Sequence, residues 1–303
     1  MKKRQLGNSV LYVSELGLGC MSLGTDEKNV QKIIEVALDE GINYFDTADL
    51  YDFGENEKLV GTALKNVREQ VIIATKGGNR WNESHDGWIW DPSKKHIKEA
   101  VKASLKRLGI DYIDLYQLHG GTIEDPIEET IEAFEELKAE GFIRYYGISS
   151  IRPNVVRTFV EKSNIVSVML QYSMLDRRPE EEILPLLKEN GIGVVTRGPL
   201  AKGLLSEKML EKATDNGYLD YTFEELKELL PVLREKLSNE RSMTEIALQY
   251  NLANPAVSSV IAGASSIEQL RENVKAIRTT PLSDEELAII KVITKMNMYD
   301  QHR

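Results

Sequence analysis

Residues 97–119 read IKEAVKASLKRLGIDYIDLYQLH, and this stretch contains the unit that decides the fold. Its first half has apolar residues at helical spacing and ends at Gly109, a residue type that often terminates helices in the left-handed conformation. Its second half, from Tyr112 to His119, is a short apolar run rich in β-favouring residues. An amphipathic helix followed by a largely apolar strand is typical of a parallel sheet covered by helices.

The same alternation runs along the whole chain. Seven further apolar runs resemble the strand at 112–119: LGLGC (16–20), INYFDTA (42–48), VIIATK (71–76), RYYGISS (144–150), VSVMLQY (166–172), IGVVTRG (192–198) and SSVIAGA (258–264). Amphipathic segments separate them, and Gly41, Gly141 and Gly191 follow three of these segments as helix-stop residues. Eight strand–helix repeats without a Pro/Gly/Ser-rich linker favour a closed (β/α)8 barrel, a single domain over residues 1–303, over an open doubly wound sheet.

Two segments lie outside these repeats. KRQLGNSVLYVSEL (3–16) has two short strand-like halves around Gly7-Asn8, which predicts a β-hairpin that closes the bottom of the barrel. TFEELKELLPVLREKLS (222–238) has helical spacing and predicts an extra helix near the C-terminus.

The composition excludes several classes of function. The 303 residues carry a formal net charge of −10 without a basic stripe or a Lys/Arg run, which argues against binding nucleic acid or an anionic membrane. Cys20 is the single cysteine and the four histidines are dispersed, so neither a disulfide framework nor a Cys/His metal site is expected. The sequence has no signal-peptide core and no membrane-spanning run. We therefore expect a cytoplasmic protein and favour a monomer.

Reactive residues follow the predicted strands at the end where barrel enzymes carry their active sites. Asp46 ends the second strand, Lys76 ends the third, His119 ends the fourth, and Tyr51 lies in the loop after the second. A buried carboxylate and a buried ammonium group on neighbouring strands should pair, because an unpaired buried charge is costly. A purely structural salt bridge between Asp46 and Lys76 is one interpretation of this pair.

The stretch YFDTADLYDFGE (44–55) also has simpler interpretations. It fails as an EF-hand calcium loop, because the third and fifth positions counted from Asp46 are Ala48 and Leu50. A solvated turn explains the last part of the stretch, which contains Asp52, Gly54 and Glu55. It does not explain Asp46, which abuts an apolar run.

Taken together, the four residues suit carbonyl reduction. Tyr51 becomes a better proton donor if Lys76 lowers its pKa, and Asp46 would keep Lys76 charged and oriented. His119 would hydrogen-bond a substrate oxygen. The sequence shows no activated Ser or Cys nucleophile, and we interpret Cys20 as a small residue of a βα turn, so acyl transfer is disfavoured.

Several longer motifs resemble the aldo-keto reductase family from end to end. They are GINYFDTADLYDFGENEKLVGTAL (41–64), VIIATKGG (71–78), SLKRLGIDYIDLYQLHG (104–120), EELKAEGFIRYYGISS (135–150) and GASSIEQLREN (263–273). The resemblance implies that Asp46, Tyr51, Lys76 and His119 match the family's catalytic tetrad.

The resemblance also implies an NADP(H) cofactor, bound extended across the barrel mouth, with NADPH favoured over NADH. The glycines of GLGCMSLG (17–24) do not have the G-x-G-x-x-G spacing of a Rossmann fingerprint. The matched cofactor positions are Gly19, Cys20, Met21, Asp46, Ser149, Gln171, Arg197, Gly198, Leu200, Lys202, Gly203, Leu205, Gly263, Ser265, Gln269, Glu272 and Asn273. Ser150 stands where many members have Asn, and Arg271 is a candidate for the 2′-phosphate. Ser265 and Ser266 precede a helix, so they suit a phosphate site, an N-cap or both.

Arg197 is a departure from the family pattern, because members usually have an aromatic residue that stacks on the nicotinamide. Its planar guanidinium can stack too, and its charge would alter the redox balance or favour an acidic substrate. For the substrate pocket, the resemblance and the tryptophan-rich loop GGNRWNESHDGWIWDP (77–92) indicate Met21, Tyr51, Trp81, Trp88 and His119. Trp90 could contribute as well, although packing of the loop on the barrel rim explains the tryptophans equally. We interpret His85 and His96 as surface residues.

The predicted function is therefore NADPH-dependent reduction of small aldehydes or ketones to alcohols, with Tyr51 as proton donor. A cofactor-sensing regulatory subunit of the same fold is the alternative. A glycosidase is disfavoured, because only Asp46 is clearly placed among the two strand-end carboxylates that it requires.

Overall fold

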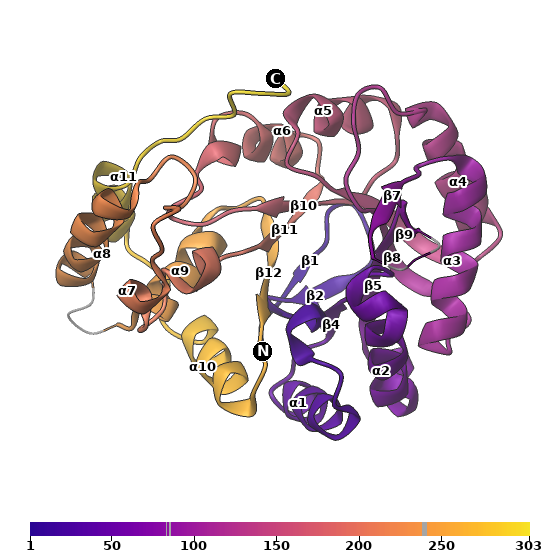
Figure 1. The fold of residues 1–303 in the computed structure, drawn as a ribbon, viewed down its shortest axis with the longest axis horizontal. Coiled ribbons are helices and arrows are strands. Elements are labelled where there is room, and N and C mark those ends of the chain that lie inside the picture. Colours follow the sequence, from indigo (N-terminus) through magenta and orange to yellow (C-terminus); the bar gives the residue numbers. More distant parts are fainter. Residues whose placement is uncertain (83, 85, 238–240) are drawn as a thin grey trace.

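The fold is a closed parallel barrel of eight strands, as the sequence predicts (Figure 1). The computed structural model describes residues 1–82, 84, 86–237 and 241–303. Around the barrel the strands follow chain order: β3 (Leu16–Gly19), β4 (Tyr44–Asp46), β5 (Ile72–Gly77), β8 (Ile113–Leu118), β9 (Ile143–Ser149), β10 (Ser167–Gln171), β11 (Gly193–Arg197) and β12 (Val257–Gly263). β12 pairs with β3 and closes the ring. Because all the strands run parallel, their carboxyl ends meet at one rim.

A helix follows each barrel strand, and these helices form the outer layer. They are α1 (Glu27–Asp39), α2 (Glu55–Leu64), α3 (Lys94–Leu108), α4 (Ile127–Ala139), α5 (Pro153–Lys162), α6 (Ile183–Glu189), α9 (Met243–Ala253) and α10 (Ile267–Ile277). Gly41, Gly109, Gly141 and Gly191 follow α1, α3, α4 and α6 at φ angles of 81°, 65°, 83° and 65°. The predicted helix-stop role of these glycines is therefore confirmed.

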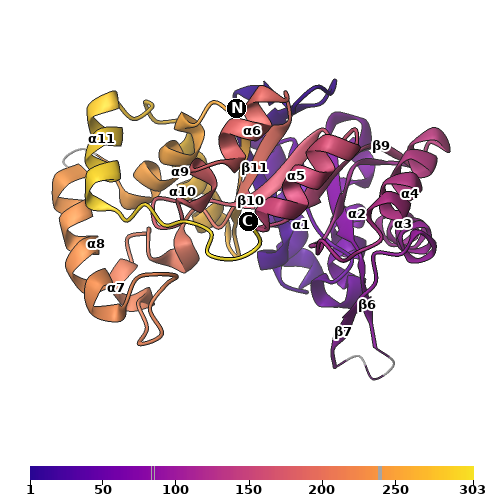
Figure 2. The ribbon, with the colours of Figure 1, turned by 90° about the horizontal axis from the view of Figure 1, so that it is seen from above.

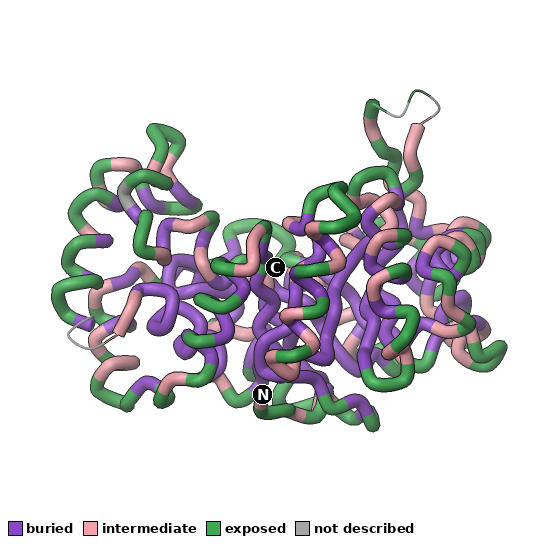
Figure 3. The backbone as a smooth tube through the Cα atoms, turned by 90° about the horizontal axis from the view of Figure 1, so that it is seen from below, coloured by how far each residue is buried: buried purple, intermediate pink, exposed green. Residues whose placement is uncertain are grey.

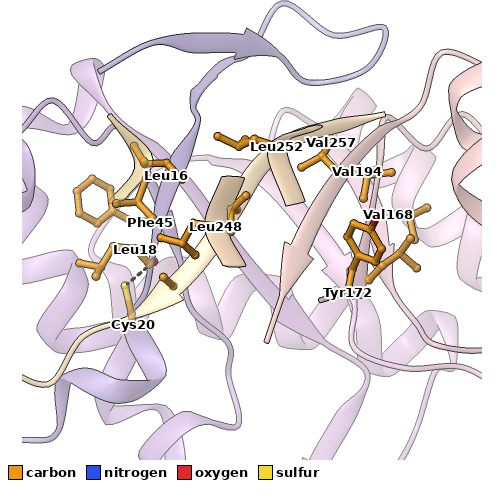
Figure 4. Close-up of a cluster of buried hydrophobic side chains, with 14 of the residues drawn as sticks. Leu16, Leu18, Cys20, Phe45, Val168, Tyr172, Val194, Leu248, Leu252 and Val257 are labelled. Carbon is orange, nitrogen blue, oxygen red and sulfur yellow. Dashed lines mark hydrogen bonds between the residues drawn. The ribbon is translucent and has the colours of Figure 1, made fainter. Parts of the chain in front are cut away.

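Apolar side chains fill the space between the barrel and the helices, which is why the strands read as apolar runs. Figure 4 shows Leu16, Leu18 and Phe45 on the barrel strands near Leu248 of α9. Colouring by burial gives the same picture, with a buried centre and an outer layer that is mostly exposed or intermediate (Figure 3).

An N-terminal hairpin closes the amino-terminal end of the barrel, as predicted. Its strands, β1 (Lys3–Gln5) and β2 (Tyr12–Ser14), pair antiparallel. Leu6, Leu11 and Val13 are buried in one cluster with residues of the barrel interior such as Tyr44 and Met169. The approach at the hairpin turn is close: a Cβ on Gly7 would lie 2.2 Å from the carbonyl oxygen of Val166, at the start of β10.

Additional elements surround the barrel. The predicted extra helix is α8 (Phe223–Leu237), which packs against α11 (Asp284–Ile293). A second hairpin, β6 (Asn79–Trp81) with β7 (Trp88–Trp90), projects away from the barrel (Figure 2). Among the described residues, no helix combines the length and the apolar character needed to cross a membrane.

Candidate active site

Three neighbouring strands bring the predicted reactive residues to one place. Asp46 is the last residue of β4, Lys76 lies near the end of β5, and His119 directly follows β8. β5 pairs with β4 on one side and with β8 on the other. Tyr51 begins the short 3-10 helix η2 (Tyr51–Gly54) in the loop after β4. The barrel therefore brings together four side chains that are up to 73 positions apart in sequence, as the span from 46 to 119 shows.

Lys76 lies at the centre of this group. Its Nζ donates to Asp46 Oδ2 over 2.7 Å and to the carbonyl oxygen of Thr47 over 2.8 Å. Only 1% of the lysine side chain and 5% of the Asp46 side chain is exposed. Burial lowers the pKa of Lys76, but Asp46 and Tyr51 outweigh burial, and the net pKa is raised. Lys76 is therefore held in its charged form.

Lys76 also donates to the hydroxyl oxygen of Tyr51, over 3.3 Å. This contact places a cation at the phenol, as predicted, but the expected fall in the pKa is wrong for this structure. Burial raises the pKa of Tyr51 by more than Lys76 lowers it, so the net shift is upward. Tyr51 is consequently a phenol that stays protonated at neutral pH, and the sequence alone could not show how deeply it is buried.

His119 faces Tyr51, with ring centroids 6.1 Å apart and ring planes at 85°. Burial, followed by the positive charges of Lys76 and Arg197, lowers the pKa of His119 from 6.5 to about 3. The imidazole is therefore neutral at neutral pH, and its buried Nδ1 atom has no partner among the described residues. A neutral imidazole donates one N–H hydrogen bond, as an oxygen-binding role requires.

The loop that carries Tyr51 adopts unusual backbone conformations. Asp52 and Phe53 have φ angles of 49° and 56°, which are rare for non-glycine residues. Asp52 is exposed, as a solvated turn predicts. For Gly54 this prediction is wrong: Gly54 is buried, and a Cβ there would lie 2.7 Å from Arg107 Cδ. The loop is thus packed against α3 and is not simply solvated.

A cavity of about 570 Å³ opens at the group. Residues from most of the strand ends line it: Gly19, Met21, Ser22, Asp46, Tyr51, His119, Gly120, Gly121, Ser149, Ser150, Ile151, Arg152, Met169, Arg197, Gly198, Ile261 and Gly263. The predicted pocket residues Met21, Tyr51 and His119 are among them. The cavity has the size and mixed character of a small-molecule site.

The tryptophan part of the pocket prediction is not supported. Trp81 and Trp88 are absent from the residues that line this cavity. Both belong to the projecting β6–β7 hairpin, where Trp88 is 57% exposed and Trp81 packs on Phe53 with ring centroids 4.3 Å apart. Trp90 instead bonds Asp125 through its indole N–H over 2.9 Å. The pairing of 79–81 with 88–90 turns this loop outward. Asp86-Gly87, a dipeptide typical of turns, directly precedes the second strand and could have indicated the hairpin.

Most of the predicted cofactor residues fall into three groups. Gly19, Met21, Asp46, Ser149, Arg197, Gly198 and Gly263 line the cavity. Leu200, Lys202, Gly203 and Leu205 form the turn after β11, where Lys202 and Gly203 have φ angles of 58° and 93°. Ser265 precedes α10, Gln269 lies in its first turn, and Glu272 and Asn273 lie in its middle. The Gln269 side chain accepts from the Ser265 backbone N–H over 2.9 Å. Ser266 is the N-cap of α10, which confirms that predicted role.

The two remaining cofactor positions, Cys20 and Gln171, are not among the residues that line the cavity. Cys20 is fully buried, and burial raises the pKa of its thiol, which agrees with a structural residue. It is not among the lining residues, because its side chain points into the core, where Sγ lies 3.6 Å from the carbonyl oxygen of Leu18 (Figure 4). Gln171 accepts from Arg197 Nη1 over 2.9 Å and donates to Asp176 over 2.9 Å.

Some residues of this region were not predicted. Arg152 lines the cavity two residues after the strand-like run 144–150, so the rule that strand ends carry function could have found it. Thr47 contributes only a backbone oxygen, which no residue pattern announces. His96, predicted at the surface, is half-buried, and its Nε2 lies 3.0 Å from the Asn79 carbonyl oxygen. His85 lies outside the described residues.

Comparison with known proteins gives consistent matches. The sequence profile of the aldo/keto reductase family matches residues 15–295. The chain is 60% identical to "Uncharacterized oxidoreductase YqkF" of Bacillus subtilis, over the whole of both proteins. It is 33% identical to the "NADH-specific methylglyoxal reductase" of Escherichia coli, with 96% of this chain and 98% of the relative covered. The solved holo form of aldo-keto reductase AKR11C1 from Bacillus halodurans is 60% identical, with a TM-score of 0.95 and with 100% of this chain and 99% of that chain covered.

Proposed function

Because the chain belongs to the aldo/keto reductase family, we propose that it reduces aldehydes or ketones to alcohols with a nicotinamide cofactor, and that Tyr51 supplies the proton. The observation that carries the proposal is the hydrogen bond from the buried ammonium group of Lys76 to the Tyr51 oxygen at the wall of the cavity. A purely structural salt bridge between Asp46 and Lys76 would not require that third contact.

The residues at the cavity fit a nicotinamide cofactor. Five glycines line the wall, and their missing side chains would allow a flat ring to approach the backbone there: Gly19, Gly120, Gly121, Gly198 and Gly263. Ser149, Gln171 and Arg197 would hold the nicotinamide, and the turn after β11 would contact the pyrophosphate through backbone N–H groups. The N-terminus of α10 would hold the adenosine end. When bound, the cofactor supplies the hydride.

The direction of the Lys76–Tyr51 hydrogen bond determines what Tyr51 can do. Because the ammonium group donates to the phenol oxygen, the hydroxyl proton of Tyr51 is free to point elsewhere, and Tyr51 lines the cavity. A carbonyl oxygen bound there would accept from Tyr51 and from the neutral imidazole of His119. As negative charge develops on that oxygen, the Tyr51 proton moves to it, and Lys76 stabilises the resulting phenolate.

We also propose that NADPH is preferred over NADH. Arg271 lies on the exposed face of α10 and forms no ion pair within the described part of the chain. A guanidinium group at that place suits the extra phosphate of NADPH. One relative, from Escherichia coli, is described as NADH-specific. The preference for NADPH or NADH must therefore be measured for each protein of the family.

A cofactor-oxidation assay tests both parts. The purified protein, given NADPH or NADH and a panel of aldehydes and ketones, should consume NADPH at the higher kcat/KM. Arg271→Gln should lower the NADPH-to-NADH ratio, whereas Lys275→Gln, a change on the same helix at a side chain that is 79% exposed, should leave it unchanged. Tight NADPH binding without turnover on any carbonyl would contradict the reductase and favour a cofactor-sensing subunit.

A further inference from the structure

Arg152 and Arg197, two arginines without ion pairs, line the cavity. Within residues 1–82, 84, 86–237 and 241–303, every arginine except Arg152, Arg197 and Arg271 forms an ion pair with a carboxylate. The chain has 48 acidic residues and a net charge of −10, so carboxylates are abundant elsewhere on the molecule. Two of the three guanidinium groups without a carboxylate partner therefore lie at this cavity, and the third, Arg271, lies on α10.

The negative charge at the cavity wall is neutralised by a neighbouring lysine. Asp46 is the one carboxylate among the described residues of the wall, and it lies 2.7 Å from Lys76 Nζ. His119 is uncharged at neutral pH because of its low pKa. With the Asp46–Lys76 pair neutral as a whole, Arg152 and Arg197 leave the cavity with an excess of positive charge.

Neutral acceptors hold both arginines in place. Arg197 Nη1 donates to the amide oxygen of Gln171 over 2.9 Å. Gln171 in turn donates to Asp176. The carboxylate of Asp176 forms an ion pair with Arg178 at 2.7 Å, and its negative charge therefore does not neutralise Arg197. These contacts orient the guanidinium group of Arg197 and leave its charge uncompensated.

Arg152 is held in the same manner. Its Nη1 donates to the carbonyl oxygen of Gly121, and its backbone N–H donates to Ser150 Oγ over 3.2 Å. Arg152 is half-buried, so part of its guanidinium group faces the cavity with donors to spare. A preoriented arginine of this kind recognises carboxylates well, because its planar fork matches the two carboxylate oxygens.

We propose that the preferred substrates of this site are carbonyl compounds that carry a carboxylate, with Arg152 as the residue that binds the carboxylate. The inference rests on the proposed reductase function, and it names the class of substrate that this function serves. Arg197 contributes a second positive charge at the cavity and bonds Gln171, a proposed nicotinamide contact. Arg152 belongs neither to the turn after β11 nor to the start of α10, where the cofactor phosphates are proposed to bind. We therefore assign the anionic group that Arg152 binds to the substrate and not to the cofactor.

Matched substrates test the assignment. The initial rate of NADPH oxidation is measured with short ω-oxo carboxylates and with their methyl esters, which have the same carbonyl group and no charge. The wild type should prefer the acid by about tenfold or more in kcat/KM, the range expected for a charge-assisted hydrogen bond. Arg152→Gln should reduce the acid-to-ester ratio towards one, mainly through the KM of the acid. Arg152→Lys should restore part of the ratio.

The controls separate this inference from simpler explanations. Arg80→Gln removes an arginine of the projecting hairpin whose side chain is 56% exposed, and it should leave the ratio at the wild-type value. For the wild type alone, the KM of the acid should rise with ionic strength while that of the ester stays constant, because salt screens the attraction. This second measurement holds even if the Arg152 variants do not fold.

Three results would overturn the assignment. They are an ester that is reduced as well as the acid by the wild type, a fall in both rates of equal size in Arg152→Gln, or weaker NADPH binding in that variant. Failure of the reductase function itself gives a different result, because neither acid nor ester would then oxidise NADPH or NADH.

Discussion

Lys76 and Asp46 form an ion pair of 2.7 Å across neighbouring strands of the barrel, with both side chains almost completely buried. Such a pair adds little net stability by itself, because desolvation of the two charges offsets their attraction. The pair is better understood as the device that keeps a cation in contact with the Tyr51 oxygen. If this interpretation is right, replacing both residues of the ion pair changes the stability of the protein little but abolishes its turnover.

Lys76→Met should destabilise the protein by about 3–5 kcal/mol, because it leaves the buried carboxylate of Asp46 without a counter-charge. The double variant Asp46→Asn with Lys76→Met should recover much of this loss and remain inactive. Urea unfolding measures the first effect and steady-state kinetics the second. Lys58→Met removes the exposed pair with Glu55 and should change stability by no more than about 1 kcal/mol. Equal stability of the single and double variants would argue against an uncompensated charge.

The pH profile of turnover should show no inflection from His119 near 6.5. Burial and the nearby charges of Lys76 and Arg197 lower its pKa to about 3, so the imidazole stays neutral throughout the range in which the enzyme is assayed. The profile of kcat/KM for a neutral aldehyde should therefore keep its shape in His119→Gln, at a lower rate. A limb with an apparent pKa of 6–7 that is present in the wild type and absent in the variant would contradict this.

The same shift has a defined effect on stability. The pKa of His119 is lower in the folded chain than in the unfolded chain, where it is close to 6.5. The unfolded chain therefore binds more protons between about pH 6.5 and 3, and the free energy of unfolding falls as the pH falls through that window. His119→Gln should lose less stability than the wild type on acidification, as unfolding curves at several pH values will show.

Asp49 provides a pH effect of opposite sign. Burial, followed by repulsion from Glu57, raises the pKa of this carboxyl from 3.8 to about 7, so the protein loses stability as the pH rises through that window. Asp49→Asn removes the ionisation, and its gain in stability over the wild type should be larger at pH 8.5 than at pH 6, by about 1 kcal/mol. Asp52→Asn alters an exposed carboxylate of the same loop and serves as the matched control. A gain that is the same at both pH values would exclude ionisation of Asp49 as its cause.

The sequence predicts those parts of this structure in which one physical rule dominates. Continuous apolar strands, helix-stop glycines such as Gly109, and the meeting of strand ends at one rim suffice for the barrel and for the neighbourhood of Asp46, Lys76 and His119. The tryptophan-rich hairpin has one local signal, the turn dipeptide Asp86-Gly87. That signal does not show that residues 79–81 pair with 88–90 and carry Trp81 and Trp88 away from the cavity.

Burial of individual groups was the second limit of prediction. A cation close to Tyr51 predicts a lowered pKa, but the net shift depends on how much of the phenol is buried, and burial has the larger effect. The sequence pattern places Gly54 in a solvated turn, whereas Arg107 of α3 packs against it. Both errors have one origin: a sequence pattern places a residue along its own element and says little about what packs on that residue from elsewhere.

The most direct test of the central claim is the turnover of Tyr51→Phe at saturating cofactor, measured together with its Kd for NADPH by fluorescence titration. Loss of the proton donor should lower kcat by about a hundredfold to ten-thousandfold and leave the Kd within about twofold of the wild type. Tyr12→Phe, at a tyrosine that is 55% exposed on the hairpin at the other end of the barrel, should change neither value. Near-normal turnover of Tyr51→Phe with intact NADPH binding would show that the proton comes from another group.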